Sequence, residues 1–206
     1  MQELVIMLMN KYGYIGILIL IMIENIFPPI PSEIILCFGG FMTTNSNLTI
    51  IGVILFSTIG SLLGAIILYM IGKMLNKERL IKIISGKTGK ILRLKKKDIE
   101  KADHWFDTKG VKTIFICRFI PIVRSLISIP AGMSEIPLTK FIILTTLGTL
   151  IWNTILTYLG SIMGQNWTKV VYIIETYSTI VLIIAIITLA IYIYHFYKKR
   201  IKKRRE

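Results

Sequence analysis

Apolar residues follow one another along most of this chain in uncharged runs about as long as a membrane is thick. No residue is charged from Tyr12 to Ile23, and the apolar stretch that begins at Leu4 extends this run to a predicted membrane helix over residues 4–24. A helix needs about 20 apolar residues to cross the hydrocarbon core. Residues 138–164 and 176–197 have the same pattern and are also predicted to span the membrane.

The uncharged run from Ile34 to Gly72 is too long for one such helix, and the polar sequence TTNSN at 43–47 divides it. Residues 48–75 are long enough to span, whereas the segment before the turn has about half the required length. That short segment follows three prolines, at positions 28, 29 and 31. Broken backbone is tolerated at membrane depth only where it is buried in protein. We therefore predict a re-entrant hairpin over residues 25–43.

Composition agrees with this pattern and excludes an ordinary soluble domain. Of 206 residues, 54% are hydrophobic and 17% are charged, which is too apolar for a water-soluble protein. The predicted helices use nearly the whole length, so that no separate soluble enzyme domain fits. We expect an all-α integral membrane protein with a single membrane domain.

Basic residues form two blocks that orient the predicted spans. Residues 73–112 hold thirteen basic and five acidic side chains, residues 198–206 hold seven and one, and the formal net charge of the chain is +14. The positive-inside rule places both the connection at 76–111 and the tail at 198–206 in the cytoplasm. The basic charge is then explained by topology and by affinity for anionic membrane lipids. We expect no nucleic acid partner.

The basic connection contains one amphipathic stretch. Asp98 can cap a short helix that Gly110 ends, and this helix would lie in the membrane interface. The residues that would share its apolar face are Ile99, Ala102, Trp105 and Phe106. A solvated loop with one amphipathic turn is the alternative.

Two of the predicted spans resemble each other. Phe56–Gly72 aligns with Leu144–Gly160 at an offset of 88 residues, and the two would cross in opposite directions. The six prolines lie in two windows, one before each of these spans, at Pro28, Pro29 and Pro31 and at Pro121, Pro130 and Pro137. We predict an inverted repeat of two re-entrant hairpins, the second over 112–137, each followed by a transmembrane helix and flanked by N- and C-terminal membrane helices. Secondary transporters have this plan, with the substrate site near the midplane; chance similarity of apolar helices is the alternative.

Four charged residues flank the proline windows. Glu24 and Glu33 bracket the first window, and Arg118 and Arg124 bracket Pro121 in the second. Each would cost about 2.5–3.5 kcal/mol if it were unpaired at the bilayer centre, so these groups must pair or meet water. Alternatively they lie at the hairpin mouths, with the arginines snorkelling into the headgroup region.

The two signs of charge suit two tasks. An arginine fork matches the oxygens of a phosphate ester and stays charged at any working pH. A buried carboxylate can instead bind and release a proton. We therefore predict Arg118 and Arg124 as phosphate-binding residues, and Glu24 and Glu33 as proton-coupling residues or charge partners of the arginines.

The remaining reactive residues do not form a recognisable site. Cys37 and Cys117 lie in apolar segments without the spacing of a disulfide framework or a metal site. His104 and His195 lie outside the predicted hairpins. We expect no metal, no cofactor and no enzymatic activity. A homodimer could form through Gly60-x3-Gly64 and Gly160-x3-Gly164, although close packing within one chain explains these glycines equally well.

At these positions the chain resembles the DedA family of membrane proteins, also called the SNARE-associated or VTT-domain family. The resemblance covers roughly residues 10–165. It is carried by ENIFPPIPSE at 24–33, Gly39-Gly40, FDTKG at 106–110, RFIPIVRSLISIPAGM at 118–133, and then Phe141, Gly148 and Trp152. Ser32 is a departure, because many members have glycine before the acid.

The resemblance implies a multi-pass transporter of the bacterial cytoplasmic membrane. Relatives include translocators of undecaprenyl phosphate and phospholipid scramblases, and members are tied to the proton motive force and the cell envelope. Glu24, Glu33, Arg118 and Arg124 match the acidic and basic functional positions of the family. We expect a flippase for a lipid with a phosphate headgroup, and undecaprenyl phosphate is the first candidate for that lipid. Its transport can be coupled to protons. A proton-coupled exchanger of a small ion or solute and a general phospholipid scramblase are the alternatives.

Overall fold

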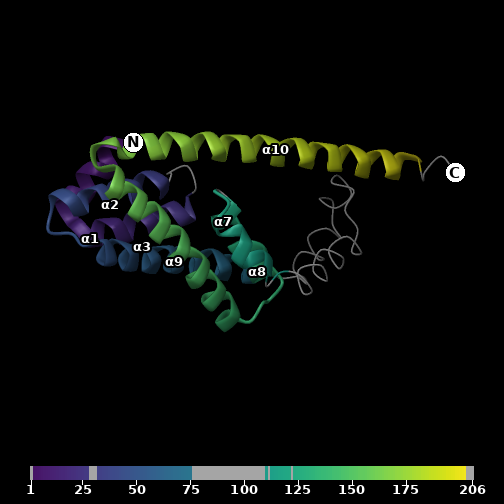
Figure 1. Cartoon of the computed structure of the whole chain (residues 1–206). Coiled ribbons are helices and arrows are strands. Elements are labelled where there is room, and N and C mark those ends of the chain that lie inside the picture. The colour runs from purple at the N-terminus through teal and green to yellow at the C-terminus, as the bar shows by residue number, and fades with distance from the viewer. Residues whose placement is uncertain (1, 28–31, 76–109, 111, 122, 203–206) are drawn as a thin grey trace.

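The fold is known from a computed structural model, which describes residues 2–27, 32–75, 110, 112–121 and 123–202 (Figure 1). Every regular element in these ranges is a helix, so the predicted all-helical class is confirmed. Residues 112–117 are also helical. The named elements are α1 (Gln2–Ile26), α2 (Ser32–Asn45), α3 (Ile50–Met74), α7 (Val123–Leu126), α8 (Ser128–Met133), α9 (Leu138–Met163), the 3-10 helix η1 (Gly164–Asn166) and α10 (Trp167–Lys202). The basic connection predicted over 76–111, with its amphipathic helix, lies outside the described residues apart from Gly110.

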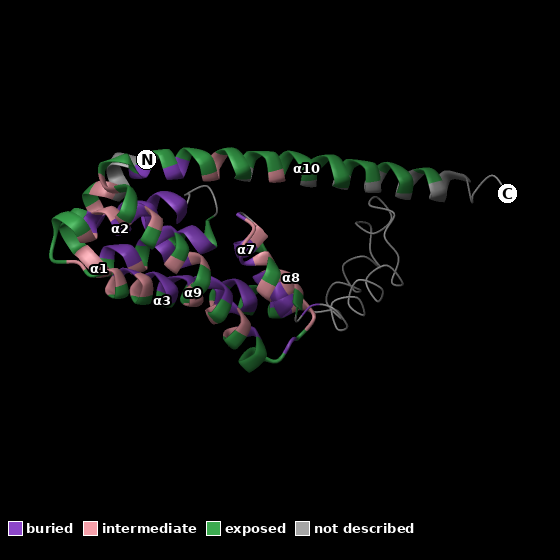
Figure 2. Ribbon diagram, in the orientation of Figure 1, coloured by how far each residue is buried: buried purple, intermediate pink, exposed green. Residues whose placement is uncertain are grey.

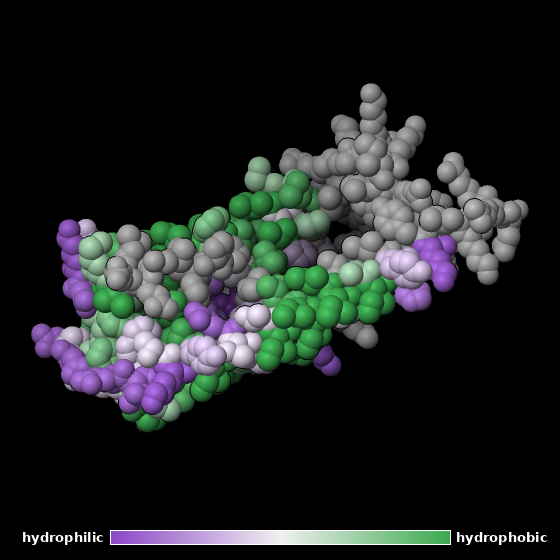
Figure 3. Space-filling model, turned by 90° about the horizontal axis from the view of Figure 1, so that it is seen from above, coloured by the Kyte–Doolittle hydropathy of each residue, from purple (hydrophilic) through white to green (hydrophobic). Residues whose placement is uncertain are grey.

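Three stretches of the described chain are long and apolar enough to cross a membrane. They are Ile6–Ile26, Ile50–Met74 and Leu138–Thr188, the last of which joins α9, η1 and the first half of α10. Large apolar side chains on these helices are exposed, among them Ile51, Leu63 and Ile183. Hydrophobic residues cover the middle of the surface seen from above and hydrophilic residues lie towards its ends (Figure 3). The protein is a membrane protein, as predicted.

Two glycines interrupt the helices in ways that the hydrophobic pattern does not reveal. Gly13 has φ 55° and ψ −126° and breaks α1, where we expected one helix over 4–24. Gly164 has φ 49° and separates α9 from α10. Glycine adopts this half of φ space at little cost because it has no Cβ. From the uncharged run of residues we also predicted the last helix at 176–197. The helix α10 instead begins at Trp167 and includes the charged residues Lys169 and Glu175.

The helix α10 has little packing beyond its first turns. Trp167, Val170 and Val171 are buried, and the Trp167 ring lies 5.3 Å from the ring of Phe38 in α2. The 36 residues of α10 extend about 54 Å at 1.5 Å per residue. Most of its described side chains beyond Val171 are exposed (Figure 2). Membrane lipid is the solvent that accommodates such an apolar surface.

Matching glycines allow the two halves of the chain to pack closely. A Cβ on Gly40 in α2 would lie 2.0 Å from the carbonyl oxygen of Thr157 in α9, and a Cβ on Gly132 in α8 would lie 2.0 Å from the carbonyl oxygen of Tyr69 in α3. Gly132 follows Gly40 by 92 residues and Thr157 follows Tyr69 by 88, close to the offset of the sequence repeat. The α2–α9 contact is therefore repeated by the α8–α3 contact.

Glycines of the two predicted dimer motifs are used inside the chain. A Cβ on Gly60 or Gly64 would clash with the α1 backbone at Leu18 or Met22, and one on Gly160 would clash with the backbone of Cys37. Of the four glycines in these two motifs, Gly164 alone has open space around it. These contacts favour the intrachain explanation for Gly60, Gly64 and Gly160.

Candidate functional site

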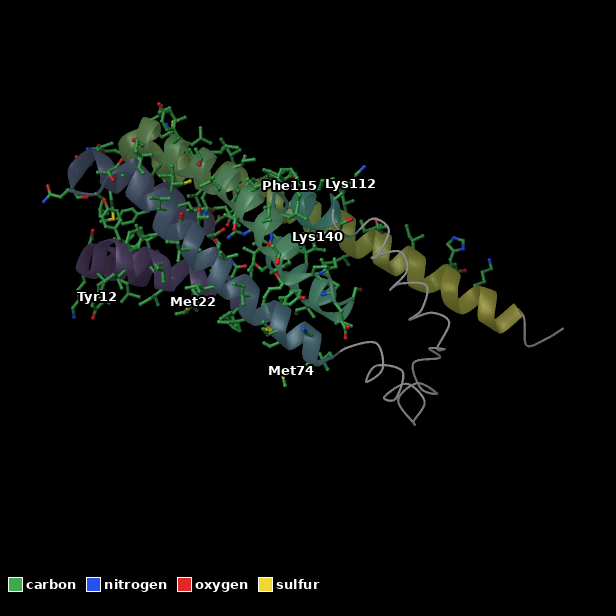
Figure 4. The ribbon with its side chains drawn as sticks, turned by 90° about the horizontal axis from the view of Figure 1, so that it is seen from below. Tyr12, Met22, Met74, Lys112, Phe115 and Lys140 are labelled. Carbon is green, nitrogen blue, oxygen red and sulfur yellow. The ribbon has the colours of Figure 1, made fainter. Side chains whose placement is uncertain are left out.

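The four charged residues of the proline windows are all buried in the same part of the protein. Glu24 lies near the end of α1, Glu33 in the first turn of α2, Arg118 in the turn after residues 112–117, and Arg124 in α7. The two glutamates are 5% exposed, Arg118 is 0% and Arg124 is 1%. The guanidinium groups are therefore turned into the protein rather than snorkelling outwards. Side-chain nitrogen and oxygen atoms lie in the interior between the helices (Figure 4).

One ion pair joins the two windows. Nη2 of Arg124 donates a hydrogen bond to Oε2 of Glu24 at 2.8 Å, across 100 residues of sequence. The Glu24 carboxylate also lies within electrostatic range of Glu33 and Arg118. The structure thus brings the predicted residues together and selects one acid–base pair among the four combinations that the sequence allowed.

Arg118 is bonded to its own half of the protein. Its Nη1 donates to the backbone carbonyl of Arg124 at 2.6 Å, and its Nη2 lies 3.2 Å from Oγ of Ser128 and 2.9 Å from Oγ1 of Thr145. The guanidinium carbon is 5.7 Å from the ring centre of Phe141, a cation–π distance. Arg118 therefore holds the turn that carries Arg124 against α8 and α9.

These bonds predict that Arg118 is required for stability. Arg118→Lys keeps the charge but replaces a planar fork with one ammonium group, which cannot reach all three acceptors. Losing two charge-assisted bonds at about 1.5 kcal/mol or more each should lower the free energy of unfolding by about 3 kcal/mol. For a chain of this length the melting temperature in detergent should fall by about 6–12 °C. Lys140→Gln on the exposed start of α9 is the control, and an equal shift in both variants would contradict this role.

Glu33 occupies a different environment from Glu24. It lies in the first turn of α2, where free backbone N–H groups and the helix dipole favour a negative charge. Within the described residues no ion pair of Glu33 is formed. Glu33 is thus placed as a second buried acid beside the Glu24–Arg124 pair rather than as a direct partner of an arginine.

Several buried polar atoms of the two arginines and of residues next to the cluster in the sequence have no hydrogen-bond partner among the described residues. They are Arg124 Nη1, Arg118 Nε, Ser125 Oγ, Ser32 Oγ, and the amide nitrogen and oxygen of Asn25. Each buried atom of this kind costs about 1–3 kcal/mol when it stays unpaired. Most of these atoms can donate a hydrogen bond, as the ligands of an anion must.

The sequence did not single out Asn25, Ser125, Ser128 or Thr145, and Ser32 was noted only as a departure from a family pattern. A signal was present for three of them. Asn25 follows Glu24, Ser32 precedes Glu33 and Ser125 follows Arg124. Thr145 carried no such signal, because it reaches Arg118 only through the packing of α9.

Comparison with known proteins shows the family of this chain. Residues 30–162 match the model of the VTT domain. The chain is 58% identical over 200 residues to the alkaline phosphatase-like protein of Lactococcus lactis subsp. lactis (strain IL1403), covering 97% of this chain and 94% of that one. It is 38% identical over 200 residues to undecaprenyl phosphate transporter A of Staphylococcus aureus (strain NCTC 8325 / PS 47), covering 97% and 98%.

A more distant relative carries the family name. Protein DedA of Escherichia coli (strain K12) is 27% identical over 139 residues, covering 66% of this chain and 61% of that one. No solved structure matches the chain significantly. The family model covers well over half of the chain, from before Glu33 to beyond Gly160. The chain therefore belongs to the VTT-domain family of membrane proteins, the family of DedA.

Proposed function

We propose that this protein is a translocase that moves a lipid with a phosphate headgroup, undecaprenyl phosphate first, between the leaflets of the bacterial cytoplasmic membrane. The observation that carries the proposal is the divided bonding of Arg124. One arm of its buried guanidinium group is paired with Glu24, and its Nη1 has no partner among the described residues. An arginine with a free arm can donate hydrogen bonds from it to a phosphate oxygen.

The chemistry of the site suits a phosphate ester, either a monoester or a diester, as the headgroup. A bound phosphate would engage Nη1 of Arg124 and the free hydroxyl and amide groups of Ser125, Ser32 and Asn25. It would also compete with Glu24 for Nη2 of Arg124. A carboxylate that loses its counter-charge in a low-dielectric site takes up a proton. When the phosphate leaves, Glu24 would release this proton to water and pair with Arg124 again. Glu33 supplies a second acid for such an exchange, and the polyprenyl chain stays in lipid.

The names of two relatives support the same substrate. Undecaprenyl phosphate transporter A of Staphylococcus aureus and the protein of that name from Bacillus subtilis (strain 168) are 38% and 39% identical to this chain. Their alignments cover 97% and 89% of it, and so include both proline windows. We carry the substrate of these transporters to this chain as a hypothesis.

The proposed architecture is a multi-pass inverted repeat whose hairpin tips meet at the site. The break at Gly13 leaves residues 14–26 as a segment of about 20 Å, which is shorter than the hydrocarbon core of about 30 Å. With α2 this segment makes the first re-entrant hairpin, which then begins at Tyr14 rather than at residue 25. Residues 112–117 with α7 and α8 make the second. The reciprocal packing of Gly40 and Gly132 supports this repeat.

Reconstitution into liposomes tests the proposal. With a leaflet-specific readout, undecaprenyl phosphate should cross faster than a glycerophospholipid, and Arg124→Gln should abolish the difference. Equal movement of both lipids would identify a general scramblase. Movement of neither, with a solute flux driven by a pH gradient, would identify a proton-coupled exchanger of a small ion or solute.

A phosphatase is the second candidate, because two relatives from Lactococcus lactis are named alkaline phosphatase-like proteins. The same vesicles distinguish it, since a phosphatase would release inorganic phosphate from undecaprenyl phosphate. We propose that no phosphate is released, and that the protein needs no cofactor or metal. Release that Arg124→Gln abolishes would replace the transport proposal with a hydrolytic one.

Thiol labelling in intact cells tests the orientation. With Cys37 and Cys117 replaced, a cysteine within 86–97 and another after Lys199 should resist an impermeant thiol reagent, because the basic blocks stay in the cytoplasm. Asn47→Cys, in the exposed turn between α2 and α3, should be labelled. Tyr12 lies towards one end of the helix bundle, and Met74, Lys112 and Lys140 lie towards the other (Figure 4). Labelling of either basic block from outside would contradict the proposed topology.

A further inference from the structure

A line of buried polar side chains runs along α9 from the charged cluster. Its members recur every four residues, so that they share one face of the helix. We call them the polar seam: Thr145, Thr149, Asn153 and Thr157, none of them more than 1% exposed. The seam begins at Thr145, whose hydroxyl lies 2.9 Å from Nη2 of Arg118.

Polar groups of α2 and α3 face the seam or continue it. Nδ2 of Asn153 donates to Oγ1 of Thr58 in α3 at 3.2 Å. One turn beyond Thr157, Ser161 lies 3.4 Å from the hydroxyl of Thr43 in α2. Residues 44–47 beside Thr43 are exposed. The polar line thus extends from the buried cluster to the end of the bundle where α2 and α3 meet.

The bonding within the seam is incomplete. Oδ1 of Asn153, Oγ1 of Thr157 and Oγ of Ser61 in α3 are buried without a partner among the described residues. Thr157 is the informative case, because a threonine within a helix commonly donates to the carbonyl four residues earlier. Other helical threonines of this chain do so: Thr149, Thr154, Thr176, Thr179 and Thr188. Thr157 leaves its hydroxyl free inside the protein.

The polar seam can be explained by hydrogen bonds between helices or by hydrogen bonds to water, and the two explanations require different partners for these atoms. Polar residues between membrane helices often serve as interhelical hydrogen-bond contacts, but that role needs partners, and Thr157 and Ser61 have none in the part of the chain that the structure describes. Buried water commonly bonds otherwise unsatisfied polar groups. The seam is also long enough to reach an aqueous face. Thr145 to Thr157 covers about 18 Å at 1.5 Å per residue, more than half of a hydrocarbon core of about 30 Å.

We propose that the polar seam is a path for water that joins the Arg118–Arg124–Glu24 cluster to the aqueous face at residues 43–49 when α9 separates slightly from α2 and α3; in the structure the path is closed, since none of its side chains is more than 1% exposed. Through it, water reaches the buried charges from the side opposite the basic connection, and protons can be exchanged along hydrogen-bonded water. The proposal rests on the proposed function in one respect. The proposed orientation of the protein makes the face at residues 43–49 the outer face of the membrane. The path itself does not depend on which lipid is transported.

Cysteine labelling without any substrate tests the path. In a protein with Cys37→Ala and Cys117→Ala, a small methanethiosulfonate reagent should modify Thr157→Cys in proteoliposomes about tenfold faster than Thr154→Cys or Ile155→Cys, because only the thiolate reacts and it forms in water. Thr154 is the matched control, since it is a threonine of the same helix that already donates to the carbonyl of Leu150. Ile155 is 45% exposed on the apolar outer face.

A blocking variant guards against a change in packing caused by the cysteine itself. Thr149→Cys should also react, and adding Thr157→Val should slow that reaction about tenfold, since valine has the shape of threonine but cannot bond water. Adding Thr154→Val should leave the reaction of Thr149→Cys unchanged. The proposal would be overturned if Thr157→Cys reacted no faster than Ile155→Cys. It would also be overturned if adding Thr157→Val left the reaction rate of Thr149→Cys unchanged. Because no lipid is translocated in these assays, their outcome is independent of the transport measurement.

Discussion

Arg124→Lys should reduce translocation of undecaprenyl phosphate about tenfold to a hundredfold while the protein stays folded. The arm of Arg124 that is free to bind phosphate and the arm that pairs with Glu24 belong to one planar group. Lysine keeps the charge but cannot serve both partners in that geometry. One lost hydrogen bond to a charged group is worth about 1.5–3 kcal/mol, which gives the expected range of rates. The initial rate in proteoliposomes measures the effect, with the melting temperature as the check on folding.

A double variant separates phosphate recognition from charge balance at the same residue. If Arg124 only neutralises Glu24, Arg124→Gln combined with Glu24→Gln should recover the activity that either single variant loses, because both buried charges disappear together. If Arg124 binds phosphate, the double variant should stay inactive. Arg124→Gln with Glu33→Gln is the matched comparison, since Glu33 is not the ion-pair partner of Arg124 within the described residues. Full activity of Arg124→Lys, or recovery specific to the Glu24 double variant, would remove Arg124 from the substrate site.

Gly40→Ala and Gly132→Ala should each destabilise the protein by about 3 kcal/mol or more. A new Cβ at either position lies 2.0 Å from a carbonyl oxygen of the facing helix, and helix backbones cannot move aside without opening the interface. Overpacking costs typically 1–3 kcal/mol and occasionally more. The melting temperature in detergent should therefore fall by about 6–12 °C.

Gly39→Ala is the matched control for this effect. It is the neighbouring glycine of the same helix, and its new Cβ would meet the Cγ1 of Val53 at 3.0 Å, a side-chain atom that can adjust. Alanine also gains about 1 kcal/mol over glycine as a helix former, which offsets a small steric cost. Similar losses at Gly40 and Gly132, with little change at Gly39, would support the repeated packing of the two halves. A stable Gly132→Ala would show that the α8–α3 contact is looser than the α2–α9 contact.

The sequence by itself determined which parts of this chain are apolar enough for a membrane and which charged residues are unusual there. Both conclusions depend on local composition. An uncharged run of 20 or more residues has few alternatives to a membrane helix, and a charge beside a proline in such a run stands out at once. The four residues Glu24, Glu33, Arg118 and Arg124 were found in this way.

Only the tertiary structure decided how those residues are used. Four charges allow several pairings, and the pairing of Arg124 with Glu24 follows from where α1 and α7 pack rather than from their neighbours in sequence. The bond of Arg118 to Thr145 and the free hydroxyl of Thr157 depend equally on the position of α9. The break at Gly13 was also invisible, because hydropathy averages over a helix and does not record the φ of one residue. Partner choice depends on distances between segments far apart in the chain, and a pattern of hydrophobic and polar positions contains no such distances.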